Sequence, residues 1–326
     1  MKTALGAPTA DQLAEAREVI ARHLSETPTV TLSVRGRPVL AKLESLQVTG
    51  SFKVRGALAA LSAVAREGSG ARVVTASAGN HGLGVAHASG LVGVPATVVV
   101  PVNASSAKVA KLRSYDIELI QWGSNYDEAQ ARAKELADTH SYKYVSAFND
   151  PWVIAGQATV FDEMLRQAPQ IDQVVVPVGG GGLLSGILLC AADRGRADVS
   201  VVGVQPAVSA ALYHVLRGAT MAEVVHGPTI ADGLAGGGDD DSVTNVIAAN
   251  HATPFHLVPE AQIRSAVAEA ASVNGLVLEG SAAAAYAALA EGIVPVSGSH
   301  VGMIASGRNI ARDLFIELLQ ESLAGH

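Results

Sequence analysis

The sequence is short of cysteine, aromatic residues and charge, and each shortage excludes a class of protein. Cys190 is the single cysteine among 326 residues, so an internal disulfide is excluded. No apolar run approaches the roughly 18 residues that a transmembrane helix needs. Aromatic residues make up 4% and charged residues 16%, so aliphatic side chains must fill a sizeable core. We therefore expect a globular protein of one or two domains.

The chain also lacks basic character. Its 23 Lys and Arg against 30 Asp and Glu give a net charge of −7, and no run is rich in Lys or Arg. Such a protein lacks the field that draws proteins to nucleic-acid phosphates, so we expect neither a nucleic-acid nor a membrane partner. The N-terminal residues contain no apolar core long enough for a signal peptide, which favours a cytoplasmic location.

Short β-branched runs alternate with longer amphipathic segments through the middle of the chain. The predicted strands are residues 73–75, 96–100, 117–121, 144–145, 174–178 and 199–204. The predicted helices are residues 80–89, 105–113, 126–138, 152–167 and 183–193, and Asp150-Pro151 is a typical helix start. This alternation predicts an α/β fold with mostly parallel strands, which bind ligands beyond their carboxyl ends.

The two ends of the chain follow a different pattern. A predicted helix at 11–24 precedes two strands, 30–34 and 38–43, which we expect to pair antiparallel. A loop at 229–241 is followed by predicted helices at 262–272 and 279–290, a strand at 300–305 and a last helix at 309–323.

Lys53 lies where a Thr-Gly-Ser-Phe segment leads into an apolar helix. A cation in the first turn of a helix is disfavoured by the positive end of the helix dipole. One interpretation is a surface lysine whose stem follows apolar surface. The other is an amine whose ammonium form is destabilised, which suits a Schiff-base lysine.

Three further strand-to-helix junctions are rich in glycine or serine. Residues 75–82 (TASAGNHG) are either an ordinary turn or a cradle of backbone N–H groups for a carboxylate or phosphate. Residues 179–182 are four consecutive glycines, which favour backbone wrapped around a phosphate, without the Lys-Ser/Thr of a Walker loop. Residues 301–309 end a strand in Ser306-Gly307. We expect the backbone N–H groups of the junction glycines, including Gly50, Gly82 and Gly307, to face an anion.

No metal site is predicted. The ten histidines show no metal-binding spacing, and residues 239–241 are interpreted as a solvated acidic loop. Cys190 falls in an apolar helix and is expected to be an inert core residue. A serine hydrolase is not supported, because no G-x-S-x-G is present.

Taken together, the four junctions resemble the fold type II pyridoxal-phosphate enzymes, specifically the threonine/serine dehydratase (ammonia-lyase) and serine racemase family. The segments that carry the resemblance are 51–57 (SFKVRGA), 77–82 (SAGNHG), 179–183 (GGGGL) and 306–307 (SG). Residues 154–157 (IAGQ), 229–233 (TIADG) and 279–281 (EGS) support it, in the family's order. The implied fold is tryptophan-synthase-β-like, with two open, twisted, mostly parallel sheets flanked by helices.

The resemblance also implies a role for each matched residue. Lys53 would hold pyridoxal 5'-phosphate as a Schiff base and act as the catalytic base, with Ser77 as a second catalytic residue. The other implied cofactor contacts are Phe52, Asn80, Gly179, Gly180, Gly181, Gly182, Leu183, Glu279 and Ser306. The substrate carboxylate would be bound by Ser77, Gly79, Asn80 and His81.

The implied reaction is β-elimination from L-threonine, L-serine or a related 3-hydroxy amino acid, giving a 2-keto acid and ammonia. A 3-hydroxyaspartate dehydratase is an alternative that needs a cation, with Arg113, Arg132 and Arg308 as candidates. A serine racemase and a catalytically silent cofactor-binding protein are further alternatives. Ala78 stands where the racemases have a second serine, which weighs against racemisation.

Three expectations concern the rest of the molecule. Gln205 and Ala211 replace the carboxylates with which racemases bind a divalent cation, which puts that cation in doubt. The resemblance implies a large cofactor-binding domain of residues 1–66 and 148–326 and a small domain of residues 67–147, without a C-terminal regulatory domain. By analogy with the family, we expect a homodimer.

Overall fold

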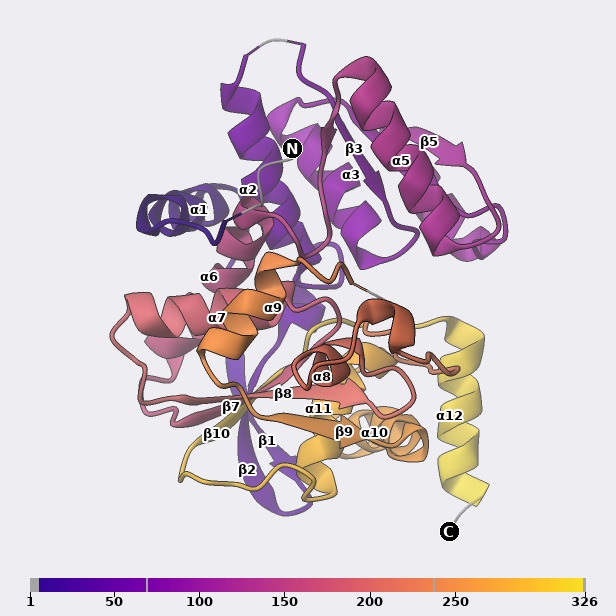
Figure 1. Cartoon of the computed structure of the whole chain (residues 1–326). Helices are drawn as coiled ribbons and strands as arrows, with labels where there is room; N and C mark the ends of the chain where they lie inside the picture. The colour runs from indigo at the N-terminus through magenta and orange to yellow at the C-terminus, as the bar shows by residue number, and fades with distance from the viewer. Residues whose placement is uncertain (1–5, 69, 237, 325–326) are drawn as a thin grey trace.

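The computed structural model describes residues 6–68, 70–236 and 238–324, and it contains two separate sheets flanked by helices. Figure 1 shows the smaller sheet at the top and the larger one at the bottom, with α2 and α6 between them. This is the α/β architecture that the alternating pattern predicts. Among the described residues, no helix is both long enough and apolar enough to cross a bilayer.

The larger sheet has six strands in the order β1-β2-β10-β7-β8-β9. The predicted antiparallel pair is confirmed, because β1 and β2 pair from Thr29 opposite Lys42 to Val34 opposite Arg37, and all other neighbours are parallel. β9 was not predicted from the sequence. The strands are β1 Thr29–Val34, β2 Arg37–Lys42, β7 Gln173–Pro177, β8 Ser200–Pro206, β9 Phe255–Val258 and β10 Val301–Ile304.

The smaller sheet has four parallel strands in the order β5-β4-β3-β6. They are β3 Val73–Ala76, β4 Ala96–Val100, β5 Glu118–Gln121 and β6 Lys143–Tyr144. Every residue of β3 and β4 is buried, as expected for parallel strands covered by helices on both faces.

The predicted helices begin and end close to their predicted positions, whereas the helices at 211–215 and 243–250 were not predicted. Thr9, Ser105, Asn125 and Asp150 each cap a helix with a side-chain oxygen, and Pro151 is the first residue of α6, as predicted. The helices are α1 Ala10–His23, α2 Lys53–Arg66, α3 Asn80–Val92, α4 Ser106–Arg113, α5 Tyr126–His140, α6 Pro151–Gln167, α7 Gly182–Asp193, α8 Ala211–Val215, α9 Val243–Asn250, α10 Glu260–Asn274, α11 Gly280–Ala290 and α12 Arg312–Ala324, with short 3₁₀ turns η1 Glu44–Leu46 and η2 Met221–Glu223.

Helix α2 connects the two sheets because it packs against both α3 and α6. A Cβ at Gly84 would lie 3.0 Å from the Lys53 carbonyl oxygen, and one at Gly156 would lie 2.5 Å from that of Arg55. Glycine at these two positions therefore lets the three helices approach closely. The first turn of α2 is thereby fixed between the sheets.

All four strands of the smaller sheet fall inside residues 67–147, the predicted small domain. Side chains of α1 and α2, including Ile20 and Leu58, share one hydrophobic core with that sheet. The placement of the domain boundaries stays a prediction.

A buried ionic cluster lies beneath the start of α2. The Arg55 guanidinium donates to both oxygens of Glu44 at 2.8 and 2.9 Å and to both oxygens of Glu163 at 2.6 and 2.7 Å. Lys42 donates to Glu163 at 2.7 Å. Arg55, Lys42 and Glu44 are 0% exposed. Burial opposes ionisation of Glu163, yet Arg55 and Lys42 hold the pKa of its carboxyl below its ordinary value.

Candidate active site

The first and fourth junctions lie side by side at the carboxyl end of β10. Ser51 and Gly307 form an isolated antiparallel bridge, and the Phe52 N–H donates to the Ser306 carbonyl at 3.1 Å. Ser306 is 2% exposed and lies next to the start of α2, as the resemblance requires. The structure thus brings Ser306 and Lys53 together from opposite ends of the chain.

The segment after β6 joins the second junction to Lys53. Lys53 Nζ donates to the Ala147 carbonyl at 2.9 Å, and His81 Nε2 lies 3.2 Å from the Val145 carbonyl oxygen. Helix α3 starts at Asn80 and passes alongside α2 at Gly84. The Lys53 amine and the predicted carboxylate cradle are therefore both held by the backbone of residues 145–147.

The four-glycine loop lies against Phe148, the residue after Ala147, and is packed so tightly that side chains are excluded. A Cβ at Gly180 would lie 2.5 Å from the Phe148 ring, and one at Gly179 would lie 2.9 Å from the Gly233 carbonyl oxygen. Gly181 has φ +86° and precedes α7, which has no side-chain N-cap among the described residues. The first N–H groups of a helix have no helical partner. This loop therefore fits a phosphate, as predicted for the cofactor.

The Lys53 amine has an unusual acidity. Burial is the main cause that lowers its pKa to about 8, and the negative charge of Glu279 opposes this effect. Lys53 Nζ lies 5.2 Å from the centroid of the Phe52 ring. The lowered pKa agrees with the second of the two sequence interpretations, a destabilised ammonium, and its first cause is burial. A pKa near 8 leaves a usable fraction of neutral, nucleophilic amine.

The second junction presents neutral hydrogen-bonding groups. Burial and then the nearby Lys53 charge lower the pKa of His81 to about 3, so its imidazole is neutral at pH 7. Its Nδ1 has no hydrogen-bond partner among the described residues. Ser77 Oγ accepts from the Gly79 N–H at 3.2 Å. The Val145 carbonyl can only accept, so the one N–H of neutral His81 is at Nε2, and its Nδ1 is left as an acceptor that cannot bind a carboxylate. The N–H groups at the start of α3 fit a substrate carboxylate through hydrogen bonds without an ion pair.

Glu279 is the buried carboxyl group of the site. It precedes α11, is 5% exposed, and accepts from Asn80 Nδ2 at 2.8 Å and from the Asn309 N–H at 2.9 Å. Burial raises the pKa of Glu279 to about 7. A Cβ at Gly307 would lie 2.6 Å from Glu279 Oε1, so glycine is needed there to admit the carboxyl group.

The structure corrects the interpretation of one glycine. The Gly50 N–H donates to the Gln47 carbonyl at 2.7 Å and so faces no anion. Gly50 has φ +79°, and a Cβ there would lie 2.7 Å from Asn309 Oδ1, so glycine makes room for this side chain. Gly82 is the third residue of α3, where a Cβ would lie 2.2 Å from the Ser77 carbonyl oxygen. The N–H of a residue at this position has no partner within its helix, so an anion facing Gly82 stays a prediction.

Several residues of the site were missed by the sequence interpretation. Asn309 is the second residue after Ser306-Gly307 and the last of the 301–309 junction, and this position was the one available signal. Lys111 on α4 donates to Asn309 Oδ1 at 2.7 Å, and nothing in the sequence around it indicates this role. Ala147 contributes through its backbone carbonyl, which no sequence pattern identifies.

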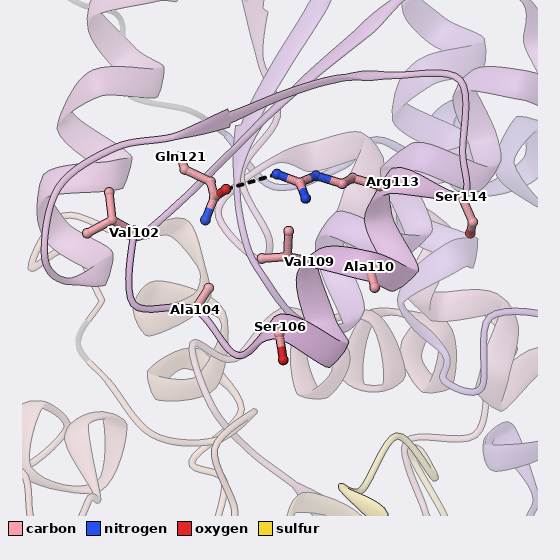
Figure 2. A pocket seen from close by; sticks show the side chains of 8 residues that line it. All are labelled: Val102, Ala104, Ser106, Val109, Ala110, Arg113, Ser114 and Gln121. Carbon is pink, nitrogen blue, oxygen red and sulfur yellow. Dashed lines mark hydrogen bonds between the residues drawn. The ribbon is translucent and has the colours of Figure 1, made fainter.

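The three arginines considered for a second substrate carboxylate lie in different parts of the molecule. Arg113 donates to Gln121 at 3.1 Å and lines a surface hollow of about 730 Å³ between α4 and β5 (Figure 2). None of the residues implied to bind the cofactor lines this hollow. Arg132 pairs with Glu135 at 2.7 Å and lies over the Trp122 ring. Arg308, in contrast, is exposed beside the site, where its charge contributes to lowering the Lys111 pKa after burial.

The segment implied to hold a cation in the racemases is organised differently here. Gln205 Oε1 accepts from the Tyr213 N–H at 2.8 Å and so binds the first turn of α8, which begins at Ala211. Among the described residues, no group of three or more His, Cys, Asp or Glu could hold a metal ion. Cys190 is buried, and burial raises the pKa of its thiol to about 12, as expected for an unreactive core residue.

Comparisons with known proteins agree with this geometry. The family model for "Pyridoxal-phosphate dependent enzyme" matches residues 20–307. An L-threonine ammonia-lyase of Thermotoga maritima is 34% identical over 307 residues, covering 94% of this chain and 76% of that protein. The structure of maize serine racemase matches with a TM-score of 0.86 at 28% identity, covering 98% of this chain and 99% of that one. A pyridoxal 5'-phosphate-dependent aspartate racemase matches with a TM-score of 0.85 at 32% identity, covering 94% of this chain and 98% of that one.

Proposed function

The chain belongs to the pyridoxal-phosphate dependent enzymes of fold type II, and we propose that it converts L-threonine or L-serine into a 2-keto acid and ammonia. Its cofactor is pyridoxal 5'-phosphate, and it resembles the threonine ammonia-lyases in sequence. The observation that carries the proposal is the Lys53 amine, whose pKa is lowered to about 8 and which donates to the Ala147 carbonyl. The same short segment contacts His81 through the Val145 carbonyl and the glycine loop through the Phe148 ring.

The roles of the protein groups follow from their positions. Backbone N–H groups of residues 179–183 would hold the cofactor phosphate, and those of residues 77–81 would hold the substrate carboxylate. Pyridoxal phosphate, when bound, supplies an electron sink that acidifies the substrate Cα–H. Lys53 Nζ would take that proton, because its lowered pKa makes a neutral amine available near pH 7 to 8. The β-hydroxyl would leave as water, taking up in net terms the proton removed from Cα, and the released enamine would hydrolyse to the keto acid and ammonia.

Two neutral residues support elimination over competing reactions. Ser306 is a neutral partner for the ring nitrogen, and it leaves the ring less electron-poor than a carboxylate would. Ala78 carries no hydroxyl, so it offers no group to return a proton to Cα from the face opposite Lys53. We therefore expect little racemisation, although maize serine racemase is similar in structure.

The direct test is to incubate the cofactor-loaded enzyme with L-threonine and L-serine and to measure keto acid and ammonia in equal amounts. Lys53→Ala is expected to abolish both products, because it removes the base and the cofactor attachment. The proposal fails if neither substrate, nor 3-hydroxyaspartate or phenylserine, yields a keto acid.

A second candidate is a dehydratase for 3-hydroxyaspartate. Lys108, Lys111 and Arg308 supply three cationic side chains near Glu279 and the 229–233 loop, which favours a substrate with a second carboxylate. The aspartate racemase matched above acts on a dicarboxylic amino acid, as its name states. A higher kcat/KM for 3-hydroxyaspartate than for L-threonine would favour this candidate.

We also propose, from the family resemblance alone, that the enzyme is a homodimer.

A further inference from the structure

We propose that Lys111 is a positioning residue that orients the Asn80 carboxamide through Asn309. Lys111, Asn309, Asn80 and Glu279 are called the amide relay below. The inference deepens the proposed function, because the resemblance places Asn80 against the cofactor. It concerns the orientation of one side chain, so it can be tested without any turnover.

The amide relay is a continuous chain of short hydrogen bonds. Lys111 Nζ donates to Asn309 Oδ1 at 2.7 Å, and Asn309 Nδ2 donates to Asn80 Oδ1 at 2.6 Å. Asn80 Nδ2 in turn donates to Glu279 Oε1 at 2.8 Å. The Asn309 N–H donates to Glu279 Oε2 at 2.9 Å, which closes the chain on itself. The first three distances lie at or just below the short end of the normal range, and the fourth is ordinary.

The direction of each hydrogen bond is determined by groups that cannot reverse it. An ammonium group can only donate, so Lys111 must face the oxygen of the Asn309 carboxamide. The Thr49 carbonyl can only accept, and it takes a hydrogen bond from Asn309 Nδ2 at 2.9 Å. The remaining N–H of Asn309 therefore faces the oxygen of Asn80. This leaves the Asn80 NH₂ group with one N–H on Glu279 and one for an acceptor in the site.

Two glycines provide the space that the relay occupies. A Cβ at Gly50 would lie 2.7 Å from Asn309 Oδ1, and one at Gly307 would lie 2.6 Å from Glu279 Oε1. Any other residue at either position would displace a member of the relay. The backbone is thus shaped around these side chains on both sides.

The relay also crosses between the two sheets. Lys111 lies on α4, which packs beside the smaller sheet, whereas Asn309 follows β10 in the larger sheet. The first hydrogen bond forms only when α4 lies against the segment after β10. We infer that approach of the two parts of the molecule completes the relay and so orients Asn80.

Lys108 supplies a matched control on the same helix. It lies three residues before Lys111, is also exposed, and pairs with Asp232 at 2.6 Å, a contact that likewise joins α4 to the larger part. It makes no contact with either carboxamide among the described residues. Both lysines are close enough to Glu279 to interact with its charge. An effect through charge alone would therefore appear in variants of both.

The experiment compares Lys111→Met, Lys111→Arg and Lys108→Met, each loaded with pyridoxal phosphate. We expect Lys111→Met to shift the visible absorbance band of the bound cofactor and to weaken cofactor binding, whereas Lys108→Met leaves the band unchanged. Lys111→Arg should restore both properties. In the Asn309→Ala background, Lys111→Met should have no further effect on the band, because the relay is already broken.

The kinetic readout separates positioning from binding. With whichever amino acid the enzyme converts, Lys111→Met should lower kcat roughly three- to tenfold, the size expected for one hydrogen bond, with little change in KM. The inference is overturned if Lys111→Met leaves the absorbance band as in the wild type, or if both Met variants shift it equally. Because absorbance needs no turnover, its outcome stands even if the proposed substrates are wrong.

Discussion

Replacing Arg55 with Met should destabilise the whole protein far more than a surface arginine would. Arg55 is fully buried and binds Glu44 and Glu163 through two bidentate pairs. Its removal leaves two buried carboxylates with Lys42 as the one remaining cation of the cluster described above. Breaking a buried pair in this way costs about 3–5 kcal/mol, a large fraction of a typical stability of roughly 5–15 kcal/mol.

The expected shift in melting temperature follows from the length of the chain. At about 2.1 cal/mol/K per residue, unfolding of 326 residues has an entropy of roughly 0.7 kcal/mol/K. A loss of about 4 kcal/mol therefore lowers Tm by about 6 °C. Differential scanning calorimetry of the wild type and Arg55→Met measures this shift directly.

Two comparisons make the prediction sharp. Arg166 pairs with Glu26 at 2.7 Å while both side chains are about half exposed, so Arg166→Met should cost less than about 1 kcal/mol. Adding Glu44→Gln and Glu163→Gln to Arg55→Met should recover part of the loss, because the unpaired charges are then gone. If Arg55→Met costs no more than Arg166→Met, the account of the cluster is wrong.

Three further predictions concern the site itself. The rate at which pyridoxal phosphate attaches to cofactor-free protein, measured by stopped-flow absorbance, should rise with pH with a midpoint near 8, because the neutral Lys53 amine predominates above its pKa. A midpoint near the pKa of an ordinary lysine, about 10.4, would contradict this. Gly181→Ala should weaken cofactor binding about tenfold or more in a titration, because φ is +86° and Thr244 would lie 2.9 Å from the new Cβ. The control Gly218→Ala, at φ +94° and with nothing within 4 Å among the described residues, should leave the affinity for the cofactor unchanged. Ala78→Ser should produce measurable D-serine from L-serine by chiral chromatography, and its absence would remove the argument that Ala78 suppresses racemisation.

The sequence predicted the elements of the fold because they follow local rules. The β3, β4 and α6 boundaries lie within one residue of the prediction, since strand runs and the Asp150 cap are written in contiguous residues. β9 was missed because it is short and lies between loops. Its place in the sheet depends on pairing with β8, which is a long-range contact.

The sequence predicted those site residues whose side-chain type itself indicates the chemistry. It missed those whose role depends only on where the fold places them. Lys53 and Ser306 stand out by type and neighbours. Lys111 looks like any exposed helical lysine, and only the approach of α4 to Asn309 gives it a role. The reason for Gly50 was likewise misjudged, because the side chain that needs its space is more than two hundred positions away in the chain.

The segment between β6 and α6 has a consequence for variation in this enzyme. Val145 and Ala147 contact His81 and Lys53 through carbonyl oxygens, which every amino acid supplies, and Phe148 lies against the glycine loop. Substitutions at positions 145 and 147 that keep the packing should therefore be tolerated. Inserting or deleting a single residue here would displace the amine, the imidazole and the phosphate loop at once. We therefore expect this segment to tolerate amino-acid substitutions but not insertions or deletions.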